Sequence, residues 1–160
     1  MSIEFSKYYR LALAACSPLA CAQWALAEEF SLMIGSPVAA QNFQAKSAQF
    51  VFRTKGCGKL AKLQVSGNAE GVVNGIRKSI RLSRIAAMPV AGVYALHREW
   101  PAEGIWVVNL TGRCDAATAS ALVPIGPNGF LRESSKFFPR SATEAEIEAS
   151  LKSLATGTNK

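Results

Sequence analysis

Apolar and polar residues alternate along much of the chain beyond residue 45, with the period of two that is typical of strands with one solvated face. The alternation is clear at residues 61–66 and again across residues 76–85, where Ile76 and Ile80 are expected to face inward. Residues 105–110 are apolar on both faces of the expected strand. This pattern predicts a strand in the centre of a sheet.

Residues typical of turns separate these segments at intervals of roughly 8 to 12 residues. Asn74-Gly75 is the strongest such turn, Gly67-Asn68 is expected to interrupt a strand, and Pro127-Asn128-Gly129 marks another turn. No helical pattern lies between the expected strands, so a parallel sheet would lack its crossovers. We therefore predict an all-β fold, an antiparallel immunoglobulin-like β-sandwich of about seven strands.

One short helix is expected at the C-terminal end of this sandwich, at residues 141–155. Thr143 and Glu146 have the spacing of a capping box. The apolar residues that share one helix face are Ile147, Leu151 and Leu154. This stripe is narrow, so the helix is expected either to lie on the sandwich or to project from it.

The first 27 residues have the pattern of a secretory signal peptide. Lys7 and Arg10 precede an apolar stretch at residues 11–26, and Ala25-Leu26-Ala27 offers the small residues at which a signal peptidase cleaves. The stretch is shorter than the roughly 20 residues that span a bilayer, and Pro18 interrupts it. We therefore expect cleavage after Ala27 and a secreted or periplasmic protein.

Two alternatives stay open at the N-terminus. Leu13-Ala14-Ala15-Cys16 resembles the lipobox of lipoproteins, which would anchor the chain through Cys16, although only about five apolar residues precede this cysteine. A start at Met33 would remove the signal altogether. With the favoured interpretation, the chain divides into a signal peptide (1–27), a linker (28–45), a β-sandwich domain (46–140) and a C-terminal helix (141–155).

Cysteine usage agrees with export. Cleavage after Ala27 would leave Cys57 and Cys114, and two cysteines in an oxidising compartment usually pair. The bridge would close a loop of more than fifty residues and would stabilise the fold by about 4 kcal/mol in the chain-entropy model. Two buried free thiols are the alternative. A metal site is disfavoured, because neither cysteine has a nearby Cys or His to complete a ligand set.

The charge of the chain is distributed unevenly. The 160 residues carry a net charge of +7, which becomes +6 without residues 1–27. Residues 30–97 hold nine basic side chains and one acid, Glu70, whereas residues 98–160 hold seven of each. An excess of this kind favours an anionic partner. The candidate contact residues are Arg77 and Arg81, on the outward face of the strand expected at residues 76–85, and Arg84 of the same segment.

The partner expected from this charge is an envelope protein or an anionic polymer, and association with a membrane surface is a further alternative. An exported location argues against nucleic acid. A solvated cationic face without a partner would carry the same charge pattern. The oligomeric state stays open.

Gly92-Val93-Tyr94, then Trp100-Pro101, then Gly104-Ile105-Trp106-Val107-Val108 resembles the hairpin motif of YtkA-like domains, which are small exported immunoglobulin-like sandwiches of bacteria. The resemblance spans roughly residues 50–123 and implies a periplasmic or cell-surface accessory domain. Some proteins of that class handle copper through His and Met ligands. This chain departs from them, because its one histidine is His97 and the methionines beyond residue 27 are Met33 and Met88.

The chain offers little from which to build an enzyme. His97 has no Ser or Cys beside it in a recognisable arrangement, and no nucleotide-binding motif is present. Glu99 and Glu103 are expected to be solvated residues of a connection rather than a pair of catalytic carboxylates. Trp100 and Trp106 are expected to fill the core, although a sugar-stacking platform is an alternative.

The sequence therefore predicts an exported binding domain with no catalytic residue, cofactor or bound metal, acting through a surface contact. A periplasmic copper-handling accessory domain is the alternative function, motivated by the resemblance, His97 and Met88.

Overall fold

The computed structural model describes residues 29–37 and 43–157, which form ten strands, two helices and two 3₁₀ turns. In chain order these elements are β1 (Ser31–Gly35), α1 (Phe43–Lys46), β2 (Phe50–Lys55), η2 (Leu60–Lys62), β3 (Leu63–Val73), β4 (Ile76–Arg81), β5 (Ile85–Ala87), β6 (Val93–Leu96), β7 (Ile105–Cys114), β8 (Ala117–Gly126), β9 (Gly129–Phe130), η3 (Arg132–Ser134), β10 (Lys136–Phe138) and α2 (Glu144–Gly157).

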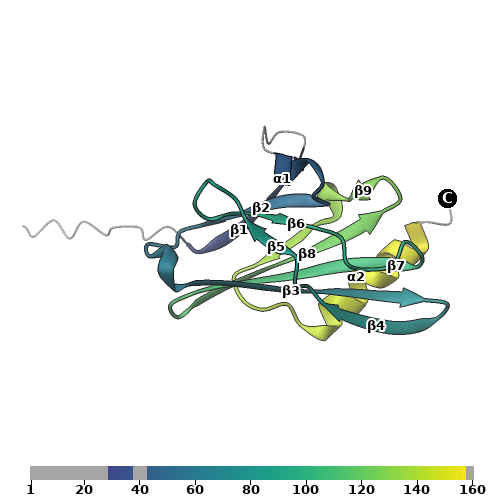
Figure 1. The fold of residues 1–160 in the computed structure, drawn as a ribbon. Helices are drawn as coiled ribbons and strands as arrows, with labels where there is room; N and C mark the ends of the chain where they lie inside the picture. The colour runs from purple at the N-terminus through teal and green to yellow at the C-terminus, as the bar shows by residue number, and fades with distance from the viewer. Residues whose placement is uncertain (1–28, 38–42, 158–160) are drawn as a thin grey trace, which may run out of the picture.

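The strands form two antiparallel sheets, and α2 lies against one of them (Figure 1). Sheet A has the strand order β1-β2-β6-β5. Sheet B has the order β10-β8-β7-β3-β4, with β9 paired to β8. The predicted all-β sandwich with a short C-terminal helix is therefore confirmed.

The core lies between the two sheets, where the inward residues of each strand form one buried cluster. Phe50 and Phe52 of β2 pack in this cluster with Trp106 and Leu110 of β7 and with Trp100 of the preceding connection. Both tryptophans are buried, so the prediction that they fill the core is confirmed.

β7 is the central strand of sheet B and is covered on both faces. Trp106 and Val108 face the core between the sheets, whereas Val107 packs under α2 with Ile147 and Leu151. The two apolar faces that predicted a central strand thus contact two different layers.

β3 runs without interruption through Gly67-Asn68, so the predicted break is wrong. Large side chains of a neighbouring strand occupy the space over its inward glycines. A Cβ on Gly67 would lie 2.9 Å from Leu110 Cδ2, and one on Gly71 would lie 2.3 Å from Trp106 Cε3. These glycines therefore mark close packing within a strand rather than turns.

The turn predicted at Asn74-Gly75 is confirmed. The φ angles of these two residues are 51° and 78°, as a two-residue type I′ hairpin turn requires. This turn joins β3 to β4.

The single strand expected at residues 76–85 is two strands in different sheets. β4 is an edge of sheet B and β5 is an edge of sheet A, so residues 82–84 cross between the layers. Ile76 was expected to face inward but is 63% exposed, because it lies beside the hairpin turn at the end of an edge strand. The prediction of one strand is wrong because apolar and polar residues continue to alternate where the chain passes from one sheet to the other.

The segments Gly92-Val93-Tyr94 and Gly104-Ile105-Trp106, expected to form a hairpin, lie in different sheets. Tyr94 lies on β6 in sheet A and Trp106 lies on β7 in sheet B. Residues 97–104 connect the two layers, so the hairpin interpretation is wrong.

The segment at residues 28–45, predicted to be a linker, contains a strand. β1 pairs along its whole length with β2, and Leu32 and Ile34 are buried in the core. β10 was not predicted either. At five and three residues, these two edge strands give too little alternation to be recognised.

α2 begins with the predicted capping box. The Glu146 N–H donates to Thr143 Oγ1 at 3.3 Å, and the Thr143 N–H donates to Glu146 Oε2 at 2.8 Å. The helix lies on sheet B, which decides between the two placements left open by its narrow apolar stripe.

The predicted signal peptide, its cleavage after Ala27 and the lipobox alternative at Cys16 lie outside the described residues. Within the described residues, no helix is long and apolar enough to span a membrane.

Candidate anion-binding surface

Arg77, the first of the predicted contact residues, is enclosed by carboxylates. Its Nη2 lies 3.2 Å from Glu70 Oε2 and 2.9 Å from Glu144 Oε1, and its Nε lies 3.5 Å from Glu148 Oε1. Glu70 is 7% exposed and also accepts a hydrogen bond from Ser79 Oγ at 2.6 Å. The positive charge of Arg77 is compensated within the protein, where it joins β4 to α2.

Arg84 lies beside a carboxylate as well. The backbone N–H groups of Ser83 and Arg84 donate to Glu99 Oε2 at 2.7 and 2.9 Å, and Ser83 Oγ donates to Glu99 Oε1. Partial burial raises the pKa of Glu99, but these hydrogen bonds and the charge of Arg84 outweigh it, so the pKa is lowered overall. Glu99 is thus more than a solvated residue, because it ties together the two connections that cross between the sheets.

Arg81 is the one member of the predicted set with an uncompensated charge. It is exposed on edge strand β4, and no carboxylate of the described residues forms an ion pair with it. The structure therefore does not gather Arg77, Arg81 and Arg84 into one free cationic surface.

A different set of basic residues gathers at one end of the sandwich, which we call the disulfide end. The disulfide end comprises the β2–β3 connection (residues 56–62), the β5–β6 turn (residues 88–92) and the β7–β8 turn (residues 115–116). The start of β1 lies there too, since Ser31 pairs with Lys55.

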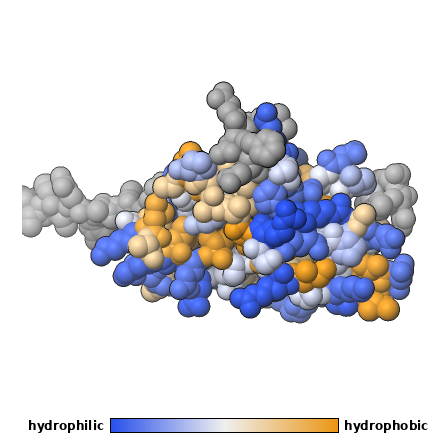
Figure 2. Space-filling view, viewed as in Figure 1, coloured by the Kyte–Doolittle hydropathy of each residue, from blue (hydrophilic) through white to orange (hydrophobic). Residues whose placement is uncertain are grey.

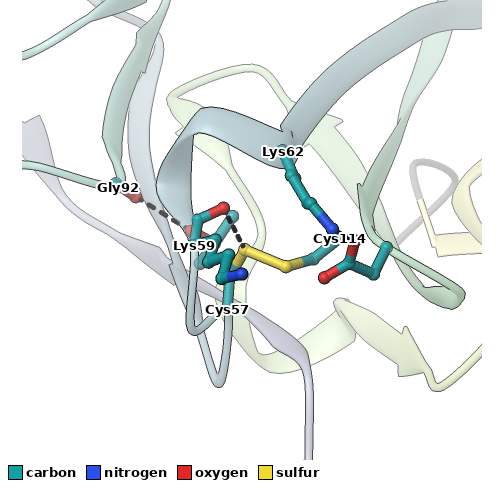
Figure 3. The surroundings of a disulfide bond; sticks show 7 residues. Cys57, Lys59, Lys62, Gly92 and Cys114 are labelled. Atoms are coloured by element: carbon teal, nitrogen blue, oxygen red, sulfur yellow. Dashed lines mark hydrogen bonds and ion pairs between the residues drawn. A yellow bond between two sulfur atoms is a disulfide. The ribbon is translucent and has the colours of Figure 1, made fainter.

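One disulfide bond and one hydrogen bond hold these loops together (Figure 3). Cys57 and Cys114 form the predicted disulfide, with their Cα atoms 5.8 Å apart. The Thr54 N–H donates to the Gly92 carbonyl at 2.9 Å, which ties the β5–β6 turn to the end of β2. The disulfide therefore fixes the β2–β3 connection to β7 of sheet B, and the hydrogen bond fixes the β5–β6 turn to β2 of sheet A.

The disulfide end carries more positive than negative charge. Lys59 is exposed, and Lys62 forms an ion pair with Asp115. The guanidinium of Arg53 contacts the sulfur of Met33 at 3.3 and 3.4 Å rather than a carboxylate. The basic residues at this end are Arg53, Lys55, Lys59, Lys62 and Arg113, and the described acids there are Glu29 and Asp115.

Exposed apolar side chains accompany these bases. Leu60 is 46% exposed in the β2–β3 connection, and Val90 is 67% exposed in the β5–β6 turn. Figure 2 shows apolar surface over sheet A toward this end, next to hydrophilic side chains. The surface thus offers cationic groups beside small apolar contacts.

The sequence contained a local indication of this surface. Lys55, Lys59 and Lys62 flank Cys57 within eight residues of the sequence. The prediction placed the contact on β4 instead, because alternation along one strand was visible whereas the approach of separate loops was not.

The residues behind the metal alternative lie apart. The Met88 N–H bonds the Val93 carbonyl at the closed end of the β5–β6 hairpin, whereas the His97 N–H bonds the Arg84 carbonyl at its open end. Among residues 29–37 and 43–157, no three His, Cys, Asp or Glu side chains are grouped closely enough to hold a metal ion.

Comparisons with protein-family models, with curated proteins and with solved structures found no match for this chain. The interpretation of the site therefore rests on the fold and on the surface just described.

Proposed function

We propose that this protein is a non-catalytic binding domain that contacts an anionic partner of the cell envelope through its disulfide end. The observation that carries the proposal is the pair of exposed basic side chains beside the Cys57–Cys114 disulfide, Arg53 on β2 and Lys59 on the connection that the disulfide holds in place. Fixed cationic groups bind a polyanion with less loss of conformational freedom than mobile ones.

An exported location supports the proposal. A disulfide between Cys57 and Cys114 persists in oxidising compartments such as the periplasm or the cell exterior. The N-terminal pattern of a signal peptide points the same way.

A non-catalytic role is proposed because the described residues lack an assembled nucleophile. The side chain of His97 forms no hydrogen bond with a Ser, Cys or carboxylate side chain in the part of the chain that the structure describes. Glu99 is engaged by three hydrogen bonds from Ser83 and Arg84, so it is committed to holding a connection.

The test compares two double variants in binding to heparin, a soluble polyanion. Arg53→Gln with Lys59→Gln removes two charges from the disulfide end. We expect roughly five- to tenfold weaker binding, since each exposed charge contact contributes a few tenths to 1 kcal/mol.

Arg81→Gln with Arg84→Gln is the matched control, because it removes the same charge from the region that the sequence alone favoured. We expect heparin binding close to wild type, apart from the small effect of lower net charge. Equal losses in the two double variants would show that overall charge rather than this surface attracts the polymer.

Vesicles containing phosphatidylglycerol distinguish a lipid surface from a soluble polymer. A lipid partner would make binding depend on Leu60 and Val90 as well as on charge, because these side chains would enter the apolar boundary of the bilayer. Leu60→Ser with Val90→Ser would then weaken vesicle binding and leave heparin binding unchanged.

A further inference from the structure

A cavity of about 720 Å³ lies at the other end of the sandwich. Its wall includes Ile105 and Trp106 at the start of β7, the paired end of β8, and the second half of α2. Trp106 and Cys114 are eight residues apart on β7, so the cavity and the disulfide end are separated by roughly 25 Å. The cavity is therefore a feature independent of the proposed cationic surface.

The wall combines aromatic and aliphatic surface with positive charge. Its large apolar side chains are Trp100, Ile105, Trp106, Ile125, Leu131 and Leu154. Two basic residues, Arg98 and Lys136, also line it, whereas no Asp or Glu does. The positive potential of Arg98 and Lys136 would attract an anionic ligand into the cavity. The apolar side chains would then contact the uncharged part of that ligand.

Arg98 is held in place by the connection that crosses between the sheets. Its Nε donates to the Trp100 carbonyl at 3.1 Å, and its Nη2 donates to the Pro101 carbonyl at 2.6 Å. These contacts fix the guanidinium plane and leave Nη1 without a hydrogen bond within the described residues. A guanidinium held in this way can bind an anion with little loss of side-chain entropy.

A buried donor in the same wall has no acceptor. Trp100 is 3% exposed, and its indole Nε1 has no hydrogen-bond partner among the described residues. The other indole of the wall is satisfied, since Trp106 Nε1 donates to the Glu103 carbonyl at 2.7 Å. Buried donors are paired in the great majority of cases, but the Trp100 N–H has almost no accessible surface, so a ligand in the cavity would not contact it and an anion is placed by Arg98 and Lys136 instead.

A buried hydroxyl lies in the helical part of the wall. Ser150 of α2 is 3% exposed, and it lines the cavity together with Ser153 and Gly157. The C-terminal end of α2 carries partial negative charge. This end disfavours an anion, which is therefore expected nearer to Arg98 and Lys136.

We propose that this cavity binds a small organic anion that has a carboxylate or sulfonate group and an apolar body of up to three rings. The volume suits such a molecule, since small-molecule sites are typically about 300 to 1,000 Å³. The anionic group is placed at Arg98 and Lys136, and the rings at Trp106, Ile105 and Leu154. This proposal does not depend on the disulfide end and can fail or succeed without it.

The test uses two fluorescent probes with the same rings and different charge. 8-Anilinonaphthalene-1-sulfonate is anionic, and N-phenyl-1-naphthylamine lacks the sulfonate. Titration into the full chain is expected to show saturable one-to-one binding of the sulfonate, and weaker binding of the neutral probe. Changes in tryptophan emission should accompany binding, because Trp100 and Trp106 line the site.

Three variants locate the binding. Arg98→Gln with Lys136→Gln should weaken sulfonate binding roughly tenfold and leave the neutral probe unchanged. Lys152→Gln, on an exposed position of α2 outside the cavity wall, is the matched control and should change neither. Ala102→Trp would fill the cavity from an exposed wall position and should abolish binding of both probes.

Circular dichroism would verify that each variant is folded, and Ala102 is exposed, so its replacement does not disturb the core. Sulfonate binding that survives Ala102→Trp in the folded protein would overturn the proposal. Binding that is insensitive to the Arg98 and Lys136 changes, or no saturable binding at all, would overturn it equally.

Discussion

Trp106 occupies the space over Gly71, and this contact shapes the centre of sheet B. The two residues are paired across β3 and β7. A Cβ on Gly71 would lie 2.3 to 2.7 Å from three carbons of the indole ring, which is closer than non-bonded atoms approach. The ring is also tied to the Glu103 carbonyl through its N–H. A large side chain over a bare backbone position makes an interior without voids.

Gly71→Ala should therefore destabilise the protein. The added methyl must displace a buried indole that cannot move without losing its hydrogen bond. We expect a loss of about 1 to 3 kcal/mol in the free energy of unfolding, measured by urea denaturation.

Gly58→Ala is the control for this prediction, because nothing lies within 4 Å of a Cβ at Gly58. Its free energy of unfolding should stay within about 0.5 kcal/mol of wild type. If the Gly71→Ala protein were as stable as the Gly58→Ala protein, the Trp106 ring would be able to move without destabilising the fold, which would contradict this prediction.

The functions of single residues were the hardest part to predict from the sequence. The disulfide between Cys57 and Cys114 and the burial of Trp100 and Trp106 follow from residue type and compartment. The compensation of Arg77 by Glu144 and Glu148 could not be foreseen. It requires knowing that α2 lies on sheet B, which is a tertiary fact absent from the local pattern.

At the scale of elements, α2 is held to the sandwich by packing and by charge. Ile147 and Leu151 cover Val107 and Leu122, and Arg77 of β4 reaches two glutamates of the helix. Arg140 closes the N-terminal end with two bonds to Glu146, at 2.7 and 2.9 Å. The helix was predictable because its cap and its period lie within a few consecutive residues.

The capping glutamate makes a testable contribution that depends on pH. The hydrogen bond from Arg140 and then those from Thr143 lower the pKa of Glu146 to about 2, from an ordinary value of 4.5. A depressed folded-state pKa stabilises the fold fully above pH 4.5, and the contribution is lost as the pH falls toward 2. Glu146→Gln should therefore lower stability at pH 7 but not at pH 2.

Thermal unfolding at a series of pH values measures this difference, with Glu148→Gln as the comparison. Glu148 lies outside the capping box and contacts Arg77 at a longer distance, 3.5 Å. An equal melting-temperature difference between wild type and Glu146→Gln at every pH would contradict the assignment of the low pKa to Glu146.

The sequence predicts that the sheets are antiparallel, but it does not predict which strands belong to which sheet. Alternation identifies β3 and β4, which the Asn74-Gly75 turn joins, and a continuous apolar run identifies β7. Neither pattern reveals that residues 82–84 and 97–104 pass from one sheet to the other. Glu99 joins these two crossing segments by accepting hydrogen bonds from the Ser83 and Arg84 N–H groups. No sequence pattern predicts this role for a single carboxylate in a connection.

At the scale of the whole molecule, the sandwich presents two ends of different chemistry. One end gathers basic loops around a disulfide, and the other holds an apolar cavity with two basic residues at its wall. Both lie where connections between strands meet. Neither site belongs to one continuous stretch of sequence, so only the folded chain reveals them.

The disulfide is the main covalent support of the first end. It links the connection between the two sheets to the end of the central strand, across 57 residues of sequence. Cys57→Ser with Cys114→Ser should lower the free energy of unfolding by about 2 to 5 kcal/mol, measured in guanidinium chloride. Wild type treated with a reductant should shift to the same midpoint, and the double variant should not respond to the reductant.

The most direct test of the central claim is hydrogen exchange at short labelling times, with and without heparin at low salt. The proposed contact predicts that heparin slows exchange in residues 53–62 and that salt reverses this protection. Residues 76–84, which include Arg77, Arg81 and Arg84, should exchange at the same rate in both conditions. Protection at residues 76–84 with none at residues 53–62 would contradict the account.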